Sequence, residues 1–263
     1  MFEFTEVSLS YSGTQHSKKH RPQIINNLSL TLAPHQFVCV LGPSGCGKTT
    51  LLNLAAGFLK PDQGQVRFDG QRIDGPSPQR GVVFQDATLF PWRTVLGNVM
   101  FGLRRQGIER RLARHQAIAL LTRVGLGEQI NAWPVTLSGG MRQRAALART
   151  LALNPQALLM DEPFSALDAN SREHLQDTLL DLWQQQPRTV LYITHSVEEA
   201  AYLADRVLIF GPAPNHVCAD LAVNLPRPRY RSSPEVQQLA RTLRQHLNQL
   251  PCCLKPLQIK ESP

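Results

Sequence analysis

The amino-acid sequence predicts an α/β fold with a parallel sheet at its core, an N-terminal antiparallel β subdomain and an inserted helical subdomain. The first two apolar segments, FEFTEVSLSY and IINNLSLTLA, alternate apolar and polar residues, as half-buried antiparallel strands do. Three later segments, ALLMDEP, TVLYITH and RVLIF, are apolar throughout and are separated by helical stretches, which is typical of parallel strands buried on both faces. Between these groups, residues 94–153 are dominated by helical periodicity.

The other elements follow in chain order. Residues 37–42, FVCVLG, form a short apolar run that predicts a strand entering a glycine-rich turn, and TTLLNLAAGF continues with helical spacing. QVRFDG and GVVFQ are two further predicted strands. The helical stretch is interrupted near Gly125 and at Trp133–Pro134, where we expect turns.

These patterns suggest two regions. Residues 1–211 are expected to form one unit with the helical subdomain inserted at about 94–153. Residues 212–263 are expected to form a basic, proline-containing C-terminal tail with one amphipathic stretch, VQQLARTLRQHL.

Composition narrows the class of protein. The chain has 263 residues, of which 42% are hydrophobic and 18% charged, so it can bury a sizeable core. No run approaches the roughly 18 apolar residues that span a bilayer, and MFEFTEVSLS lacks the pattern of a signal peptide, so we expect a cytoplasmic chain. The cysteines show no CxxC pair and are expected to be free thiols: Cys39, Cys46, Cys218, Cys252 and Cys253.

The net charge is +8, from 28 Lys and Arg against 20 Asp and Glu. The excess lies in two blocks: residues 86–131 hold seven arginines against three acids, and residues 211–263 hold seven Lys or Arg against three acids. Such a balance suits nucleic acid, an anionic membrane face or a phosphorylated ligand. Neither block is interleaved with aromatic residues as a base-stacking surface would be.

The motif GPSGCGKT lies between a predicted strand and a predicted helix, the context that a phosphate-binding P-loop requires. Its glycines let backbone N–H groups converge on phosphate oxygens. Lys48 supplies positive charge to the β- and γ-phosphates, and Thr49 offers a hydroxyl to Mg²⁺. We therefore expect a P-loop NTPase core whose nucleotide site includes Gly42, Pro43, Ser44, Gly45, Cys46, Gly47, Lys48, Thr49 and Thr50.

The apolar segment LLMDE ends in two adjacent carboxylates, Asp161 and Glu162. In P-loop proteins an aspartate at such a strand end holds Mg²⁺, and a carboxylate one residue later can orient or deprotonate the attacking water. Taken alone, this pair is as compatible with a structural capping role as with a catalytic one. With a P-loop upstream, it predicts a hydrolase.

A second phosphate-binding feature is LSGG, in which Ser138 can cap a helix while Gly139 and Gly140 leave its N-terminus open to an anion. A chain with one P-loop has no obvious need for another phosphate site. A P-loop kinase or other phosphotransferase would leave this segment unexplained.

In their order along the chain, GPSGCGKTT, Gln85, LSGGMRQ, LLMDE, SALD and His195 resemble the motifs of ATP-binding cassette ATPases, the engine subunits of ABC transporters. The resemblance covers roughly residues 1–211, and LSGG is its most specific part. It implies ATP and Mg²⁺ as ligands and a head-to-tail homodimer, in which LSGG of one subunit closes on the ATP held by the P-loop of the other. Ser138, Gly139 and Gly140 would therefore act in trans.

The resemblance also implies catalytic roles. Glu162 would be the general base, and His195, at the end of TVLYITH, would contact the γ-phosphate. Gln85 would touch Mg²⁺ or the attacking water and report on the membrane partner, so the expected Mg²⁺ site comprises Thr49, Gln85 and Asp161. A structural histidine and a solvated glutamine are the alternatives for His195 and Gln85.

The resemblance implies roles for two further residues. Tyr11 stands where the family places an aromatic ring that stacks on adenine, although an ordinary strand-end tyrosine is the alternative because a long loop follows it. Asp168, in SALD, would organise the dimer interface.

The sequence departs from the family pattern at Met141 and Ser196, where Gln and Asp are more usual. We also expect a capping box between Ser196 and Glu199 to fix His195 just outside the next helix.

The type of cassette ATPase is indicated both by features that the sequence lacks and by segments that resemble one import group. No sustained heptads separate the P-loop from LSGG, and the chain carries one cassette, which argues against chromosome-organising and translation-factor types. GVVFQDATLFPWRTVLGNVMFGL, DEPFSALDA and LPRPR resemble the nitrate/sulfonate/taurine import group, and its taurine ATPases closely. This implies uptake of a small anion, separate transmembrane permease subunits, an extracytoplasmic substrate-binding protein, and a peripheral location on the cytoplasmic face of the membrane.

The transported substrate and one alternative function stay open. No residue of this chain identifies the transported substrate, because in this family the ATPase subunit does not contact the substrate. The alternative function is a soluble, non-transport cassette ATPase acting on nucleic acid or ribosomes; only the net charge supports it, and we expect no direct nucleic-acid partner.

A segment after Gln85, residues 86–106, is expected to form the groove for the permease. It presents the apolar residues Leu89, Phe90, Pro91, Trp92, Val95 and Phe101. The core of the helical subdomain would produce a similar pattern, so core packing is the alternative.

Overall fold

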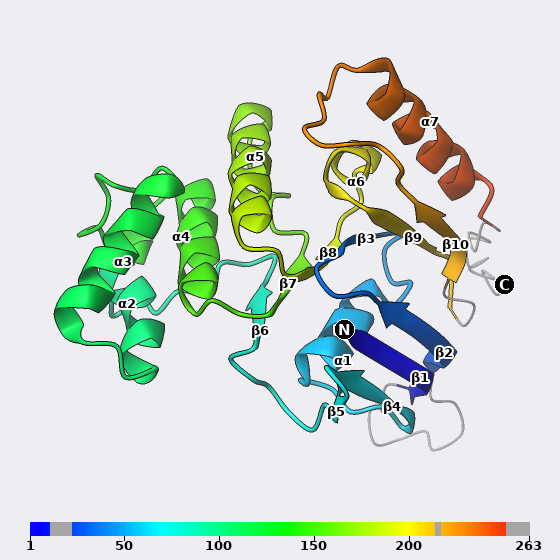
Figure 1. Ribbon diagram of the computed structural model, residues 1–263, viewed down its shortest axis with the longest axis horizontal. Helices are drawn as coiled ribbons and strands as arrows, with labels where there is room; N and C mark the ends of the chain where they lie inside the picture. Colours follow the sequence, from blue (N-terminus) through cyan, green and yellow to red (C-terminus); the bar gives the residue numbers. More distant parts are fainter. Residues whose placement is uncertain (11–22, 214–216, 251–263) are drawn as a thin grey trace, which may run out of the picture.

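The computed structural model describes residues 1–10, 23–213 and 217–250, and two sheets form its frame (Figure 1). The smaller sheet is antiparallel and has the strand order β2-β1-β4-β5. Phe2 pairs with Leu32 on one side and with Phe68 on the other, and all three are buried. Its strands are β1 (Phe2–Ser10), β2 (Gln23–Leu32), β4 (Gln63–Phe68) and β5 (Gln71–Arg72). The predicted N-terminal antiparallel subdomain is confirmed.

The larger sheet has the strand order β10-β9-β3-β8-β7-β6. All neighbouring strands in it are parallel except β10, which pairs antiparallel with β9. Its strands are β3 (Phe37–Leu41), β6 (Arg80–Val83), β7 (Ala157–Asp161), β8 (Thr189–Ile193), β9 (Arg206–Phe210) and β10 (Val217–Ala222). The apolar runs chosen as parallel strands are therefore strands of one sheet, and the α/β fold is confirmed.

Each central strand divides its side chains between two apolar layers. In β3, Phe37, Cys39 and Leu41 enter the layer beneath most of the helices, whereas Val38 and Val40 enter the layer shared with α1 and the antiparallel sheet. This split follows from the two-residue period of a strand. Because both faces are covered, β3 has no exposed residue, which explains its continuously apolar sequence.

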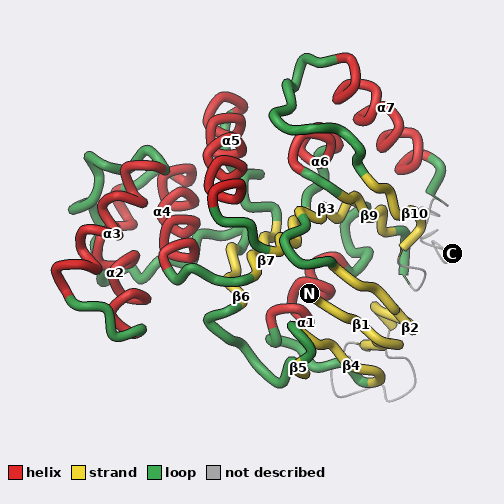
Figure 2. Tube along the Cα trace, in the orientation of Figure 1, coloured by secondary structure: helices red, strands yellow, loops and turns green. Residues whose placement is uncertain are grey.

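Apart from α1, which packs between the two sheets, the described α-helices form two groups. Helices α2, α3 and α4 pack together beyond β6, whereas α5 and α6 lie over the other part of the sheet and α7 packs on α6 (Figure 2). Their bounds are α1 (Lys48–Ala56), α2 (Val95–Arg105), α3 (Arg110–Arg123), the 3₁₀ turn η1 (Pro134–Thr136), α4 (Gly139–Ala152), α5 (Ala169–Gln185), α6 (Val197–Leu203) and α7 (Pro234–Asn248). The predicted helical insertion is thus a three-helix unit, with an additional break between α2 and α3 that the periodicity did not indicate.

The described part of the C-terminal region packs on this frame. Strand β10 extends the larger sheet, and α7 lies across α6 (Figure 1). Arg229 is buried and donates to the carbonyl oxygens of Ala201, Tyr202 and Ala204 at the end of α6. Burial lowers the pKa of the Arg229 guanidinium to about 10. Arg229 therefore serves the fold, because helix-end carbonyls need donors.

Two expectations from composition can be compared with the structure. Within the described ranges, none of the helices combines the length and apolar character needed to cross a bilayer. Cys39 and Cys46 are buried and Cys218 is exposed, and no disulfide joins these three. Cys252 and Cys253 lie outside the described residues.

Candidate active site

The predicted site residues gather at the carboxyl edge of the larger sheet. Strand β3 leads into the P-loop, β7 ends at Asp161, and β8 is followed by His195. Since β8 lies between β3 and β7, the strand order places these three chain segments side by side. In open α/β sheets, ligands bind outside this edge.

The P-loop connects β3 to α1 by a backbone that requires glycine at two points. Gly47, immediately before α1, has φ of 97°, in the left-handed region that favours glycine. At Gly42 a Cβ would lie 2.4 Å from the carbonyl oxygen of Phe210, so a side chain would collide with β9. The loop can therefore turn tightly and present its N–H groups along the start of α1.

Lys48 is the first residue of α1 and is buried despite its charge. Its Nζ donates to the carbonyl oxygens of Gly42 (2.8 Å) and Pro43 (2.7 Å). The ammonium group is thus held inside the loop, where an anion would meet it in a medium of low dielectric constant. The Cys46 thiol is also buried there, and burial raises its pKa despite the nearby Lys48.

Asp161 and Thr49 meet next to the P-loop. Burial raises the pKa of the Asp161 carboxyl, while the Thr49 hydroxyl and Lys48 lower it and Glu162 raises it. Thr49 therefore already contacts the carboxylate with which it would share a cation. Thr50, the last P-loop residue predicted, is buried on α1.

Glu162 and His195 form a pair across the ends of β7 and β8. His195 Nδ1 lies 3.2 Å from Glu162 Oε2, and the Glu162 backbone N–H donates to Ile193 O at 3.0 Å. Glu162 has φ of 42°, a left-handed conformation that is unusual for a residue with a side chain and is often found at functional sites. The backbone bond and the side-chain contact together hold the Glu162 carboxylate beside His195 at the carboxyl edge of the sheet.

The expected capping box after His195 is only half formed. Ser196 Oγ accepts from the N–H of Glu199 at 3.2 Å, as predicted for an N-cap. The carboxylate of Glu199 does not return to the N–H of Ser196; that group donates to Thr194 Oγ1 instead. Glu199 is buried and is drawn inward by the hydroxyl of Thr194, which is why the reciprocal half is absent.

The LSGG segment begins α4 in the helical unit. Ser138 caps α4, with Oγ accepting from Met141 N at 3.2 Å, and both Ser138 and Gly139 are exposed. A Cβ at Gly140 would meet a side chain of the segment after β7, Leu167, at 2.7 Å. Figure 1 shows α4 and α1 on different sides of β6, so this helix start is separate from the P-loop group within one chain.

Three further residues were predicted to belong to the site: Gln85, Asp168 and Tyr11. Gln85 is exposed just after β6. Asp168 caps α5, where its carboxylate accepts from Ser171 N at 3.0 Å, and hydrogen bonds from Ser171 lower its pKa. Tyr11, which is predicted to contact adenine, lies outside the described residues.

Sequence reasoning missed two residues that tie α4 to the chain around Gln85. Gln143 is buried and its Nε2 donates to Phe84 O at 2.8 Å. Arg149 donates to Thr88 O at 2.6 Å and lies over the ring of Phe90, 5.4 Å from its centroid. The sequence did contain a signal for them, because both are polar residues on the otherwise apolar inner face of a helix.

The segment expected to form the permease groove is divided in the structure. Trp92 is 69% exposed, whereas Val95 is fully buried in the helical unit. The inclusion of Val95 in the surface was therefore wrong, because its helix turns it toward the core. Phe90 is partly buried and contacts both Trp92 and Phe101.

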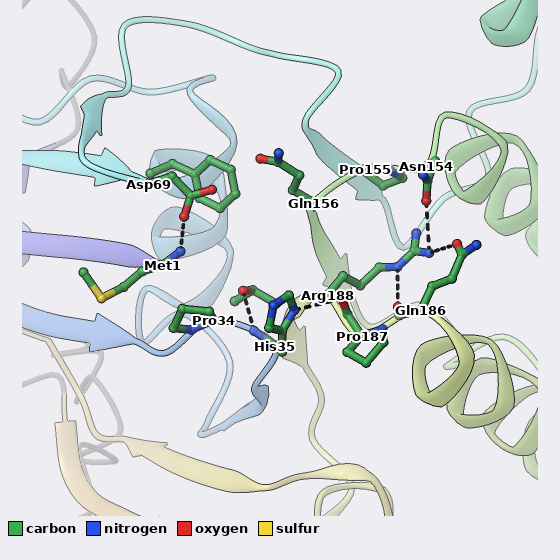
Figure 3. Close-up of a pocket in the computed structure, with 12 residues that line it drawn as sticks. Met1, Pro34, His35, Asp69, Asn154, Pro155, Gln156, Gln186, Pro187 and Arg188 are labelled. Atoms are coloured by element: carbon green, nitrogen blue, oxygen red, sulfur yellow. Dashed lines mark hydrogen bonds and ion pairs between the residues drawn. The ribbon is translucent and has the colours of Figure 1, made fainter.

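A cavity of about 390 Å³ lies at the opposite, amino edge of the larger sheet (Figure 3). Several of its polar groups bond to one another: Met1 pairs with Asp69, His35 Nδ1 lies 2.8 Å from Pro187 O, and Arg188 donates to Gln186 Oε1 at 3.0 Å. These contacts fasten strand ends together. None of the predicted site residues lines this cavity.

The chain is similar to known proteins in sequence and in fold. A family model described as ABC transporter matches residues 25–165. An uncharacterized ABC transporter ATP-binding protein of Methanocaldococcus jannaschii is 48% identical over 216 residues, 82% of this chain and 81% of that protein. A taurine import ATP-binding protein of Pseudomonas aeruginosa is 46% identical over 239 residues, 91% of this chain and 90% of that protein. A solved dimeric ATP-binding cassette bound to ADP and Pi has a TM-score of 0.76 at 28% identity, covering 86% of this chain and 100% of that chain.

Proposed function

Because the chain belongs to the ATP-binding cassette family of ABC transporters, we propose that it is the ATP-hydrolysing subunit of an importer for a small anion such as taurine, another aliphatic sulfonate or nitrate. Members of this family bind and hydrolyse ATP, form dimers and work with membrane permease components. The observation that carries the importer assignment is the likeness to a taurine import ATP-binding protein over 91% of the chain, well beyond the cassette motifs.

The proposed chemistry uses the carboxyl edge of the larger sheet. The P-loop residues 42–50 hold the phosphates, and Lys48 exchanges its bonds to loop carbonyls for bonds to phosphate oxygens. Glu162 takes a proton from the attacking water, and His195, 3.2 Å from it, contacts the γ-phosphate. Ser138, Gly139 and Gly140 complete the site of the partner subunit, and Asp168 lies at the same interface. Tyr11 is proposed to stack on adenine.

The donors present suit a magnesium ion. Thr49 offers a hydroxyl, Gln85 an amide oxygen and Asp161 a carboxylate, and hard oxygen ligands of this kind are those that Mg²⁺ prefers. The side-chain hydrogen bond between Thr49 and Asp161 supports this assignment. A bound Mg²⁺ would supply charge neutralisation at the β- and γ-phosphates.

The proposed partners are a second copy of the chain, separate permease subunits and an extracytoplasmic substrate-binding protein, with the chain held at the cytoplasmic face of the membrane by the permease. This assembly can be tested by affinity capture from detergent-solubilised membranes of the source cells. We expect a hydrophobic permease and a binding protein to copurify, and the binding protein to bind taurine, an alkanesulfonate or nitrate in a calorimetric titration. Salt-sensitive capture of RNA or ribosomes without a permease would contradict the proposal.

Trp92 is proposed to be a central residue of the permease contact, since it is an exposed aromatic side chain beside Phe90. Trp92→Glu should reduce copurified permease at least about tenfold, because a buried unpaired charge is costly at an interface. The ATP hydrolysis rate of the isolated chain should stay within about twofold of the parent.

The matched control is Leu112→Glu, which changes another exposed apolar residue of the helical unit. It should leave permease capture unchanged. Equal capture by Trp92→Glu and the parent chain would place the permease contact elsewhere.

A further inference from the structure

The loop that carries His195 is held from behind by a buried carboxylate. Glu199 is 8% exposed and accepts hydrogen bonds from Thr194 Oγ1 (2.5 Å), Tyr192 OH (3.1 Å) and Gln176 Nε2 (3.1 Å). Hydrogen bonds to a charged acceptor in a medium of low dielectric constant are strong and directional. The Glu199 carboxylate therefore joins α6, on which it lies, to α5 and β8.

Thr194 connects the Glu199 carboxylate to the backbone of the loop that carries His195. Its hydroxyl accepts from Ser196 N at 3.0 Å, and its own N–H donates to Val40 O at 3.2 Å. The residues on both sides of His195 are thus tied down. The His195 side chain itself is 66% exposed, so its place beside Glu162 depends on the backbone beneath it and not on packing around the ring.

Gln176 connects Glu199 to the C-terminal segment. Gln176 is 3% exposed; its Nε2 donates to Glu199 and its Oε1 accepts from Arg231 Nη2 at 3.0 Å. With both ends of the amide bonded, its orientation is unique, because a flip would lose both bonds. Arg231 is anchored in turn by Asp177 Oδ1 at 2.7 Å and by the ring of Tyr202, 3.7 Å from its guanidinium carbon.

We propose that Arg231 and Gln176 are positioning residues for His195, through which the folded C-terminal segment sets the rate of ATP hydrolysis. The hydrogen-bonded series, called here the His195 relay, consists of Arg231, Gln176, Glu199, Thr194 and Ser196. The proposal rests on the role of His195 given under the proposed function. It adds residues that lie outside the nucleotide site and outside the matched cassette motifs.

The relay should act on turnover and not on nucleotide affinity. Its members do not belong to the P-loop, which supplies the phosphate contacts. A small displacement of a group that contacts the reacting phosphate lowers the rate of the chemical step, since displacements near 1 Å can cost about a hundredfold. Loss of the relay should therefore lower kcat while the KM for ATP stays nearly constant.

The first test compares two arginines of the C-terminal segment in the full chain. Arg231→Met and Gln176→Leu should lower kcat about tenfold or more, with KM within about twofold. Arg227→Met is the matched control, since Arg227 also pairs with an aspartate, Asp205, and lies over an aromatic ring, Trp183, but does not touch Gln176. It should keep kcat within about twofold.

A second pair separates positioning from general stability. Thr194→Val removes the hydroxyl at nearly constant shape and should lower kcat, whereas Thr194→Ser keeps the hydroxyl and should restore most of the rate. Thr194 is 2% exposed, so thermal unfolding is measured for both variants. Equal kcat for the two variants, at equal stability, would overturn the relay.

A spectroscopic readout distinguishes failure of the relay from failure of the His195 assignment. In chain labelled with ¹⁵N-histidine, the His195 side-chain signal, identified with His195→Ala, should shift in Arg231→Met and Gln176→Leu and stay in place in Arg227→Met. If His195→Ala loses activity but Arg231→Met and Gln176→Leu keep both signal and kcat, the relay is wrong. If His195→Ala hydrolyses ATP normally, the proposed role of His195 fails, and an unmoved His195 signal would then also overturn the relay.

Discussion

Glu162→Gln is expected to bind ATP with unchanged affinity and to hydrolyse it at least about a hundredfold more slowly than the parent chain. The substitution keeps the size of the side chain and its hydrogen-bonding reach toward His195. It removes the group that would accept the proton from water, and general base catalysis contributes typically 10² to 10⁴ in rate. The phosphate contacts of the P-loop are untouched, so the nucleotide should remain bound.

The consequence of slow hydrolysis should be a trapped dimer. With ATP and Mg²⁺, Glu162→Gln should elute as a dimer in gel filtration while the parent chain returns to monomer as it turns over. Glu128→Gln, a change at an exposed glutamate of the helical unit, is the control and should behave as the parent chain does. A Glu162→Gln chain that stays monomeric with ATP and turns over at the parent rate would exclude Glu162 as the base.

The fold was predictable wherever burial alone determines the pattern. Strands such as β3 and β8 are covered on both faces, so their residues are apolar without interruption and could be recognised in the sequence. The P-loop was predictable for a different reason. Its backbone at Gly42 and Gly47 tolerates only glycine, and few other structures require that spacing next to a lysine and a hydroxyl.

The residues around the site were less predictable because their roles depend on neighbours that are distant in sequence. Glu199 fits a capping box locally, but its carboxylate is taken by donors from β8 and α5. Arg229 and Arg231 look like tail charges, yet one binds the end of α6 and the other binds α5. Charge patterning gives the number of basic residues, and only the packing of α7 on α6 shows which of them the fold uses.

The second large effect is expected at the LSGG segment. Ser138→Arg should bind ATP but lose nearly all hydrolysis, because a long cation would occupy the place where the partner's γ-phosphate is proposed to lie. Ser138 is exposed and caps α4 through one bond to Met141 N, so its loss should cost only about 1 kcal/mol of stability. Lys48→Ala should instead lose tight ATP binding, since Lys48 is the buried cation of the P-loop.

Mixing the two inactive variants tests whether Ser138 acts in trans. In a two-fold dimer with composite sites, a heterodimer of Ser138→Arg and Lys48→Ala carries both lesions in one site, and its other site joins an intact P-loop to an intact LSGG segment. If that single site turns over independently, an equimolar mixture should recover up to about a quarter of the parent rate, because half of the dimers are mixed and each has one intact site of two. Were Ser138 to act on the nucleotide of its own chain, every site in the mixture would carry a lesion and no recovery would occur. When one intact site suffices for turnover, mixed dimers detected by native mass spectrometry without any recovered hydrolysis would contradict the trans arrangement.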